Sequence, residues 1–265
     1  MKQFEGKVAL VVAATKGIGL ACAQGLAQGG ATVYLGVRRM DAGQEIAEQI
    51  IAEGGKAAAV YFNAKEIESY QTMVNTVIEK EGHIDILINN YGGTDVKQDF
   101  DIVKTDVQYF NETLCTNLNS VFLPVKYAVP HMPKGGAIVN IGSIGGYNPD
   151  LDRISYCVSK AAVMSLTENI ATQYARLGIR CNCVMPGMIA TEALLNNMPQ
   201  AFIDAFLKHV PLQRFGQAED IANAALFLAS DQASFITGHC LPVAGGYKVP
   251  APTYGDAAPK MIDEK

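Results

Sequence analysis

Tyr156 and Lys160 lie four residues apart in the segment Tyr156-Cys157-Val158-Ser159-Lys160, and Ser143 lies thirteen residues before the tyrosine. If this segment is helical, a spacing of four places the phenol and the ammonium on one face, one turn apart. A fixed positive charge favours the phenolate form of a tyrosine, which can then exchange a proton near neutral pH. That chemistry is needed when a hydride is added to a carbonyl or removed from an alcohol. Taken alone, the spacing is weak evidence for a catalytic pair, because Tyr and Lys four residues apart are common on helix surfaces.

The size and composition of the chain suit one large core. It has 265 residues, of which 49% are apolar and 18% are charged, and α/β chains of this length are often single domains. The net charge is −5 and no basic cluster exceeds the pair Arg38-Arg39, which disfavours nucleic acid and anionic membranes as partners. No apolar run approaches the roughly 18 residues that span a bilayer. The run from Val8 to Ala14 is too short for a secretory signal.

The cysteine pattern predicts reduced thiols in a cytoplasmic protein rather than disulfides. None of the six cysteines forms a C-x-x-C pair, so we expect no metal site. The residues concerned are Cys22, Cys115, Cys157, Cys181, Cys183 and Cys240.

Apolar runs typical of strands alternate with longer segments of helical period. The strand runs contain mainly Val, Ile, Leu and Ala without strict alternation, which suits strands buried on both faces. Repeated β-α units predict an α/β, doubly wound Rossmann fold with a parallel seven-stranded sheet and helices on both faces. The predicted strands are Val8–Val12, Thr32–Val37, Ala57–Phe62, Ile84–Asn89, Ala137–Ile141, Arg180–Met185 and Cys240–Val243.

The helical segments stand between these strands, and include Gln44–Glu53, Tyr70–Lys80 and Ala161–Leu177. No linker or repeat interrupts the chain before residue 247. We therefore expect residues 1–247 to form one catalytic domain. Residues 248–265 carry three prolines and a polar end, so we expect a tail that extends over the surface or a neighbouring subunit.

The turn after the first strand has the composition of a phosphate-binding loop. It reads Ala13-Ala14-Thr15-Lys16-Gly17-Ile18-Gly19 and leads into a helical stretch that ends near Gln28. Gly17 and Gly19 let the backbone approach a pyrophosphate, and the following helix supplies N–H groups and the positive end of its dipole. The same glycines would also serve a purely structural turn.

The end of the second strand bears on the choice of dinucleotide. An acidic residue is expected there if the ribose 2′-hydroxyl is to be bound, but Val37 is followed by Arg38 and Arg39. Arg38 can pair with a 2′-phosphate, and Lys16 can reach the same group. This favours NADP over NAD. Asp41 is the nearest acid, and we expect it at a helix N-cap.

Together these marks resemble the short-chain dehydrogenase/reductase superfamily over residues 4 to 247. Two positions depart from its pattern: Ala13 replaces the first loop glycine, and Tyr91 stands in Asn-Asn-Tyr-Gly where the family has alanine. Tyr91 adds a large ring that could narrow the choice of substrate. The matching marks, in chain order, are Thr15 to Gly19, Asn89 to Gly92, Asn117, Ser143, Tyr156 with Lys160, Pro186-Gly187 and Thr191.

The resemblance implies a role for each matching residue. Tyr156 would be the general acid/base, Lys160 would favour its phenolate and bind the nicotinamide ribose, and Ser143 would hold the substrate oxygen. Asn117 would position a water between Lys160 and solvent. The four histidines match none of these roles. The implied cofactor-binding set comprises Thr15, Lys16, Gly17, Ile18, Gly19, Arg38, Arg39, Asn63, Ala64, Asn90, Tyr91, Gly92, Tyr156, Lys160, Pro186, Gly187, Ile189 and Thr191.

Longer segments are similar to bacterial bile-acid hydroxysteroid dehydrogenases, particularly the NADP-dependent 7α type. They are Val60 to Ala64, Asn89 to Thr94, Arg153 to Lys160, Ile179 to Asn182 and Val243 to Gly246. This resemblance implies a homotetramer that oxidises a steroid hydroxyl. Sister enzymes acting at the 12α or 12β position would share most of these segments. A 3-oxoacyl or small-ketone reductase, and a cofactor-binding regulatory protein with a degenerate site, stay open as more distant alternatives.

The substrate side is expected from two segments. Residues 189–210 carry apolar side chains at helical spacing, and the family has a mobile lid in this region. Such spacing more often indicates core packing than ligand contacts, but a lid that covers a steroid would need such an apolar face. Just after Ser143, we expect three residues to face the same pocket as Tyr156, namely Ile144, Tyr147 and Asn148.

Overall fold

The computed structural model describes residues 2–190, 199–247 and 255 of the chain. Within them lies one seven-stranded sheet whose neighbouring strands all pair in parallel. This confirms the predicted fold class. In spatial order the strands are β3 (Lys56–Tyr61), β2 (Thr32–Val37), β1 (Val8–Val12), β4 (Ile86–Asn89), β5 (Ala137–Ile141), β6 (Arg180–Pro186) and β7 (Cys240–Val243).

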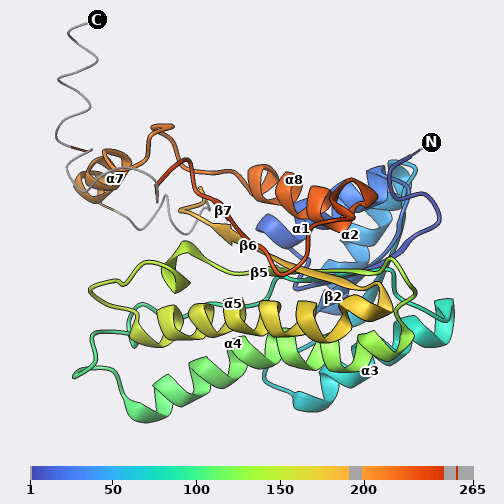
Figure 1. Ribbon diagram of the computed structural model, residues 1–265, viewed down its shortest axis with the longest axis horizontal. Coiled ribbons are helices and arrows are strands. Elements are labelled where there is room, and N and C mark those ends of the chain that lie inside the picture. The colour runs from blue at the N-terminus through green and yellow to red at the C-terminus, as the bar shows by residue number, and fades with distance from the viewer. Residues whose placement is uncertain (1, 191–198, 248–254, 256–265) are drawn as a thin grey trace, which may run out of the picture.

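Helices cover both faces of this sheet (Figure 1). One face carries α1 (Gly17–Gln28), α2 (Met40–Ala52) and α8 (Ala218–Ala229). The other face carries α3 (Ile67–Glu81), α4 (Val107–Ala128) and α5 (Ile154–Tyr174). The short α7 (Gln200–Leu207) lies to one side of the layers (Figure 1). Four 3₁₀ turns complete the elements: η1 (Val129–His131), η2 (Ile144–Gly146), η3 (Ala175–Leu177) and η4 (Asp231–Ala233).

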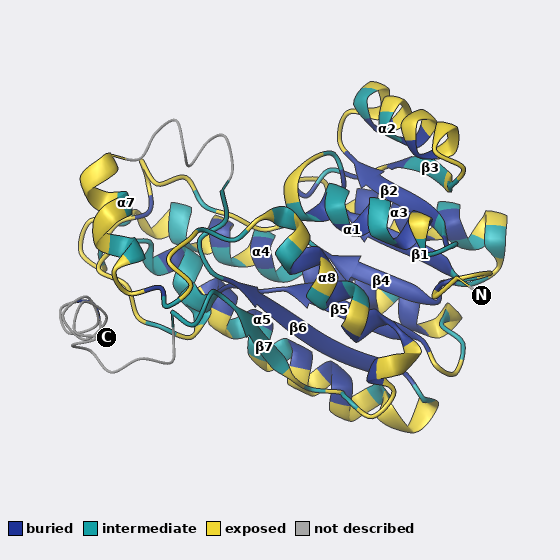
Figure 2. Cartoon of the chain, turned by 90° about the horizontal axis from the view of Figure 1, so that it is seen from above, coloured by how far each residue is buried: buried dark blue, intermediate teal, exposed yellow. Residues whose placement is uncertain are grey.

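Strand β1 shows why apolar and polar residues do not alternate strictly along the strands. All five of its residues are buried. Ala9 and Val11 belong to the apolar cluster under α1, α2 and α8, whereas Val8, Leu10 and Val12 belong to the cluster under α3, α4 and α5. Figure 2 shows the same central strands as the buried layer between more exposed helices. A strand that faces two cores must be apolar at every position.

Several predicted element boundaries were wrong by a few residues. Helix α5 begins at Ile154, well before the predicted start at Ala161, so the Tyr156–Lys160 segment is helical. Asp41 lies in the first turn of α2, whereas the N-cap is Arg39. The predicted strand that began at Ile84 begins at Ile86. In the described part of the chain, no helix has the length and apolar content required to cross a membrane.

Candidate active site

Tyr156 and Lys160, the pair predicted to transfer a proton, lie in the first two turns of α5. Lys160 is 3% exposed, and its Nζ lies 5.7 Å from the centroid of the Tyr156 ring. The same Nζ donates a hydrogen bond of 3.0 Å to the carbonyl of Ile141, the last residue of β5. This bond fixes the ammonium but leaves its other protons for a ligand. The structure therefore brings the tyrosine and the lysine together at the carboxyl end of the sheet.

Ser143 follows β5 and begins the turn η2. Its Oγ accepts a hydrogen bond of 3.0 Å from the Gly145 amide. A Cβ placed on Gly145 would lie 3.3 Å from Ser143 Oγ and 3.5 Å from Tyr156 Cε1, so the serine and the tyrosine flank one point. A Cβ on Gly146 would lie 2.5 Å from the Lys160 backbone, which shows how closely η2 approaches α5. Only glycine permits that approach.

Asn117, on α4, attaches the loop after β4 to helix α5. Its side chain is 2% exposed and binds Gly93 in both directions, donating to the carbonyl and accepting from the amide, each at 3.0 Å. Its Nδ2 also donates to Ser159 Oγ at 2.8 Å. In the same loop, a Cβ on Gly92 would lie 2.7 Å from Lys160 Nζ. The four residues predicted for catalysis thus lie close together, and the loop at Gly92 and Gly93 contacts Lys160 and Asn117.

The predicted phosphate loop forms a tight turn from β1 into α1. Gly17 has a positive φ of 56° and Ala13 one of 60°. A Cβ on Gly19 would lie 2.4 Å from the Ala13 carbonyl oxygen, which also accepts from Asn90 Nδ2 at 3.1 Å. Alanine at position 13 therefore keeps the turn but holds a left-handed conformation that costs an L-residue about 1–2 kcal/mol.

The first turn of α1 offers free donors for an anion. Lys16 occupies the N-cap position without capping the helix through its side chain, so the first N–H groups have no side-chain acceptor from that residue. Lys16, Arg38 and Arg39 are exposed, and none has an ion-pair partner within the described residues. A glycine turn, a helix N-terminus and unpaired cations fit the phosphates of a dinucleotide.

Other residues of the predicted cofactor set lie near strand ends. Asn63 and Ala64 follow β3, and Tyr91 follows β4. The Tyr91 ring packs edge-on against Phe62, with the ring centroids 5.9 Å apart. Tyr91 is thus directed toward the end of β3, which gives no support to a substrate-selecting role. Thr15 and Ile18 belong to the phosphate loop, Pro186 ends β6, Gly187 and Ile189 follow it, and Thr191 lies outside the described residues.

The predicted substrate residues lie in and after η2. Tyr147 is exposed, and the Asn148 amide donates to the Ile144 carbonyl at 2.8 Å. In the region predicted as a lid, α7 places Phe206 in a stack with Tyr247, with ring centroids 4.9 Å apart. Residues 191–198 of that region lie outside the described part of the chain.

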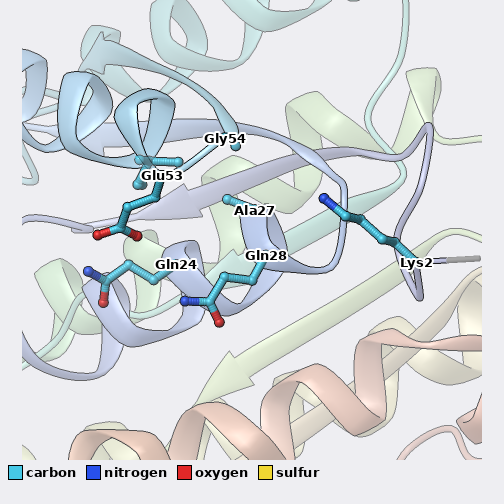
Figure 3. A pocket seen from close by; sticks show the side chains of 8 residues that line it. Lys2, Gln24, Ala27, Gln28, Glu53 and Gly54 are labelled. Carbon is cyan, nitrogen blue, oxygen red and sulfur yellow. The ribbon is translucent and has the colours of Figure 1, made fainter.

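Two hollows lie apart from this cluster. One, of about 170 Å³, is lined by Lys2, Gln24, Glu53 and neighbouring residues at the amino ends of β2 and β3 (Figure 3). A second, of about 150 Å³, lies beside Met188, Phe206 and Ala244 near the carboxyl ends of β6 and β7. Ligands of open α/β sheets bind at carboxyl ends of strands, so the first hollow has no part in the chemistry.

Sequence reasoning missed two close contributors to the site, Gly146 and Ser159. Gly146 belongs to no motif, and glycine is required at this position only because η2 packs closely against α5. No motif assigns a role to Ser159, which stands between Tyr156 and Lys160. Its Oγ nevertheless accepts a hydrogen bond from Asn117 and donates one to the Tyr156 carbonyl at 2.7 Å. All six cysteines are free in the structure. Within the described residues, no group of three His, Cys, Asp or Glu side chains could hold a metal.

Comparison with known proteins agrees with this geometry. The family described as "Enoyl-(Acyl carrier protein) reductase" matches residues 12–248. The 7alpha-hydroxysteroid dehydrogenase of Clostridium sardiniense is 52% identical over 98% of this chain and 100% of its own. The protein of that name from Paraclostridium sordellii is 50% identical over 100% of both chains. A solved double mutant of a Serratia marcescens short-chain dehydrogenase/reductase superposes with a TM-score of 0.87, at 30% identity over 93% of this chain and 100% of that one.

A family match over most of the chain, two full-length relatives and a shared fold all point the same way. The chain belongs to the short-chain dehydrogenase/reductase family of oxidoreductases, which act with a nicotinamide cofactor.

Proposed function

We propose that this protein is an NADP-dependent 7α-hydroxysteroid dehydrogenase that reversibly oxidises a bile-acid hydroxyl to a ketone. The observation that carries the proposal is the meeting of Ser143, Tyr156 and Lys160 at the end of β5. It occurs in a chain that is half identical, over its whole length, to two proteins named for that activity.

In this proposal each of the three side chains has a part in alcohol oxidation. Oxidation removes a hydride from the carbon and a proton from the oxygen, and the nicotinamide ring takes the hydride when it is bound. The Tyr156 phenolate accepts the proton, with the Lys160 ammonium beside it. Ser143 Oγ already accepts from Gly145, and no described residue accepts its proton. That proton is free to bind the substrate oxygen.

The substrate position is tested with bile acids that differ only in one hydroxyl. Nicotinamide absorbance should rise with acids that carry a 7α-hydroxyl and stay flat with the 7β epimers. Oxidation of a 12-hydroxylated acid that lacks a 7-hydroxyl would defeat the 7α assignment and favour the 12α or 12β alternative. Turnover of 3-oxoacyl thioesters in preference to steroids would favour the 3-oxoacyl reductase alternative instead.

The catalytic assignment is tested by Tyr156→Phe. This variant keeps the ring but loses the exchangeable proton, so kcat should fall by about a thousandfold. Binding of NADPH, followed by its fluorescence, should stay close to that of the unaltered protein. Substantial turnover by the variant would show that another group transfers the proton.

NADP rather than NAD is proposed because Arg38 and Arg39 stand exposed and unpaired after β2, within the described residues. The change Arg38→Ala should weaken the binding of NADPH by about tenfold or more. It should affect the binding of NADH little, because only NADPH carries the 2′-phosphate. Arg176→Ala removes an exposed arginine from η3 and serves as the matched control. Equal losses for both dinucleotides would defeat the cofactor assignment.

A homotetramer is proposed on two grounds. The family resemblance implies it, and large apolar side chains stand exposed on separate elements. Phe235 lies near β7 and Phe227 lies on α8, whereas α4 carries Phe122 and Val107. Exposed apolar groups on two faces suit two kinds of subunit contact, as a closed tetramer requires.

A further inference from the structure

Helix α5 begins without a cap from its own neighbourhood. The N-cap residue is Arg153, which has a positive φ of 59° and makes no side-chain capping bond. The first N–H groups of a helix have no partner inside the helix and need acceptors from elsewhere. These N–H groups include those of Ser155 and Tyr156, the second of which carries the proposed proton-transfer group.

A distant carboxylate supplies the missing acceptors. Asp99, in the loop after β4, is 1% exposed. Its Oδ1 accepts from the Ser155 amide at 2.9 Å and its Oδ2 from the Tyr156 amide at 3.0 Å. The backbone reinforces this attachment, because the Arg153 amide donates to the Asp99 carbonyl at 3.3 Å and the Ile154 amide to the Phe100 carbonyl at 3.1 Å.

A third donor to Asp99, the hydroxyl of Thr94, is the last member of a chain of hydrogen bonds. The Thr94 hydroxyl donates to Asp99 Oδ2 at 2.7 Å, which uses its one proton. Thr94 Oγ1 also lies 2.9 Å from the Tyr109 hydroxyl, which must therefore be the donor in that contact. The Tyr109 oxygen in turn accepts from the Asp95 amide at 2.6 Å. The Tyr109 hydroxyl also lies 3.5 Å from the Asp95 carbonyl, and the shorter contact with Thr94 is the one that continues the chain to the carboxylate.

No cation faces this carboxylate among the described residues. The positive end of the α5 dipole takes that place. Burying a carboxylate costs free energy unless its oxygens are hydrogen-bonded, and Asp99 has three donors. The arrangement therefore fixes the loop and the helix against each other tightly.

The segment from Gly93 to Asp99 is attached to α5 at two points. Asn117 links Gly93 to Ser159, and Asp99 holds the amide of Tyr156. The same loop presents Gly92 to Lys160 Nζ. A cap supplied by residue 152 or 153 would stabilise the helix equally well, but it would leave the tyrosine independent of this loop.

We propose that Asp99 is a positioning residue, which sets the place of the Tyr156 phenol by anchoring the first turn of α5 to the loop after β4; the proposal rests on the proposed role of Tyr156. Asp99 is buried and its side-chain oxygens are bonded to Thr94, Ser155 and Tyr156, so we assign it no direct contact with a ligand. It acts through the tyrosine, and its loss should affect the chemical step more than ligand binding.

The test compares Asp99→Ala, Asp99→Asn and a matched control. Without the carboxylate, kcat for a 7α-hydroxylated bile acid should fall by about a hundredfold, because small misplacements of a catalytic group have effects of that size. The KM for the steroid and the dissociation constant of NADPH should change by less than about threefold. Asp99→Asn keeps one acceptor oxygen and should recover part of the loss.

Asp101→Asn is the control. Asp101 Oδ1 accepts from two backbone amides of the same loop, those of Val103 and Lys104, each at 3.0 Å, and its side chain makes no hydrogen bond to α5 within the described residues. This variant perturbs the loop without touching the helix. Its kcat should stay within about twofold of the unaltered protein.

A second measurement does not depend on the substrate. Hydrogen exchange followed by mass spectrometry should show faster exchange of the amides of residues 155 and 156 in Asp99→Ala, with the core strands unchanged. An unchanged kcat, or equal losses in kcat and in NADPH binding, would overturn the proposal. If the unaltered protein oxidised no steroid, the proposed function would fail, and unchanged exchange at residues 155 and 156 would separately overturn the anchor.

Discussion

Gly92 and Gly93 are neighbours in the sequence but stand in different surroundings. Gly92 has a φ of 153°, and a Cβ there would lie 2.7 Å from Lys160 Nζ and 3.4 Å from Asn117 Oδ1. A Cβ on Gly93 would meet nothing within 4 Å. One glycine therefore makes room for the ammonium, whereas the other serves through its backbone, which Asn117 binds.

This difference predicts opposite results for the two alanine variants. Gly92→Ala should lower kcat by about tenfold or more, because the methyl group displaces the Lys160 ammonium and strains the backbone. Gly93→Ala should retain most of the activity. Steady-state kinetics at saturating cofactor measures both. Equal activities of the two variants would show that Lys160 moves aside without consequence.

At the residue scale, the sequence predicted the side chains that match a motif but missed those whose roles arise from folding. Tyr156, Lys160, Ser143 and Asn117 stand at motif positions. Asp99 does not: it meets Ser155 across 56 positions of sequence. No periodicity or spacing signals such a contact, because it depends on the path of a loop.

The start of α8 is a compact electrostatic unit. Asp220 and the N-cap Gln217 form a capping box, in which the Gln217 amide donates to Asp220 Oδ2 at 2.8 Å. The Arg214 guanidinium holds the same carboxylate with two bonds, of 2.6 and 3.0 Å. The hydrogen bonds from Arg214, followed by the one from Gln217, lower the pKa of Asp220 to about 2.

A pH dependence of stability follows from that lowered pKa. A carboxylate with a lower pKa in the folded state stabilises the fold above its unfolded pKa, about 3.9, and this contribution disappears as the pH falls through about 2. Asp220→Asn should therefore lower the free energy of unfolding at pH 7. The difference from the unaltered protein should shrink as the pH falls below about 4.

Urea unfolding at a series of pH values measures this difference. It should be modest, because the pair is largely exposed to solvent. Glu219→Gln is the matched control, since Glu219 lies in the same first turn without an ion pair among the described residues. A difference that stayed constant with pH would mean that Asp220 acts only as a hydrogen-bond acceptor.

At the element scale, strands were predictable and helix starts were not. Four of the predicted strands agree with the structure at both ends: Val8–Val12, Thr32–Val37, Ala137–Ile141 and Cys240–Val243. Burial on two faces makes such runs continuous in sequence. The start of α5 contains Ser, Tyr, Cys and Val, which are poor helix formers. The helix begins there because Asp99 supplies acceptors, and local propensity does not record that.

At the scale of the whole molecule, the described residues include large apolar side chains that stand exposed. Phe235 is fully exposed, between η4 and the edge strand β7, and Phe227 on α8 is also exposed. An open sheet edge beside aromatic side chains is suited to pairing between subunits.

Phe235→Asp should therefore break one class of contact and convert the proposed tetramer into dimers, since it would place a charge in an apolar interface. Light scattering after size-exclusion chromatography measures the mass. Leu177→Asp, at an exposed site in η3, is the matched control and should keep the original mass. An unchanged mass for Phe235→Asp would place the subunit contact elsewhere.

The strand order also has a consequence for biosynthesis. Strand β1 pairs with β2 on one side and with β4 on the other, although β4 begins only at Ile86. While the chain leaves the ribosome, β1, β2 and β3 can form a partial sheet whose β1 edge is unpaired. Asn90, which binds the Ala13 carbonyl, emerges just after β4. The nascent chain therefore cannot complete its dinucleotide turn before about a third of the protein has been translated.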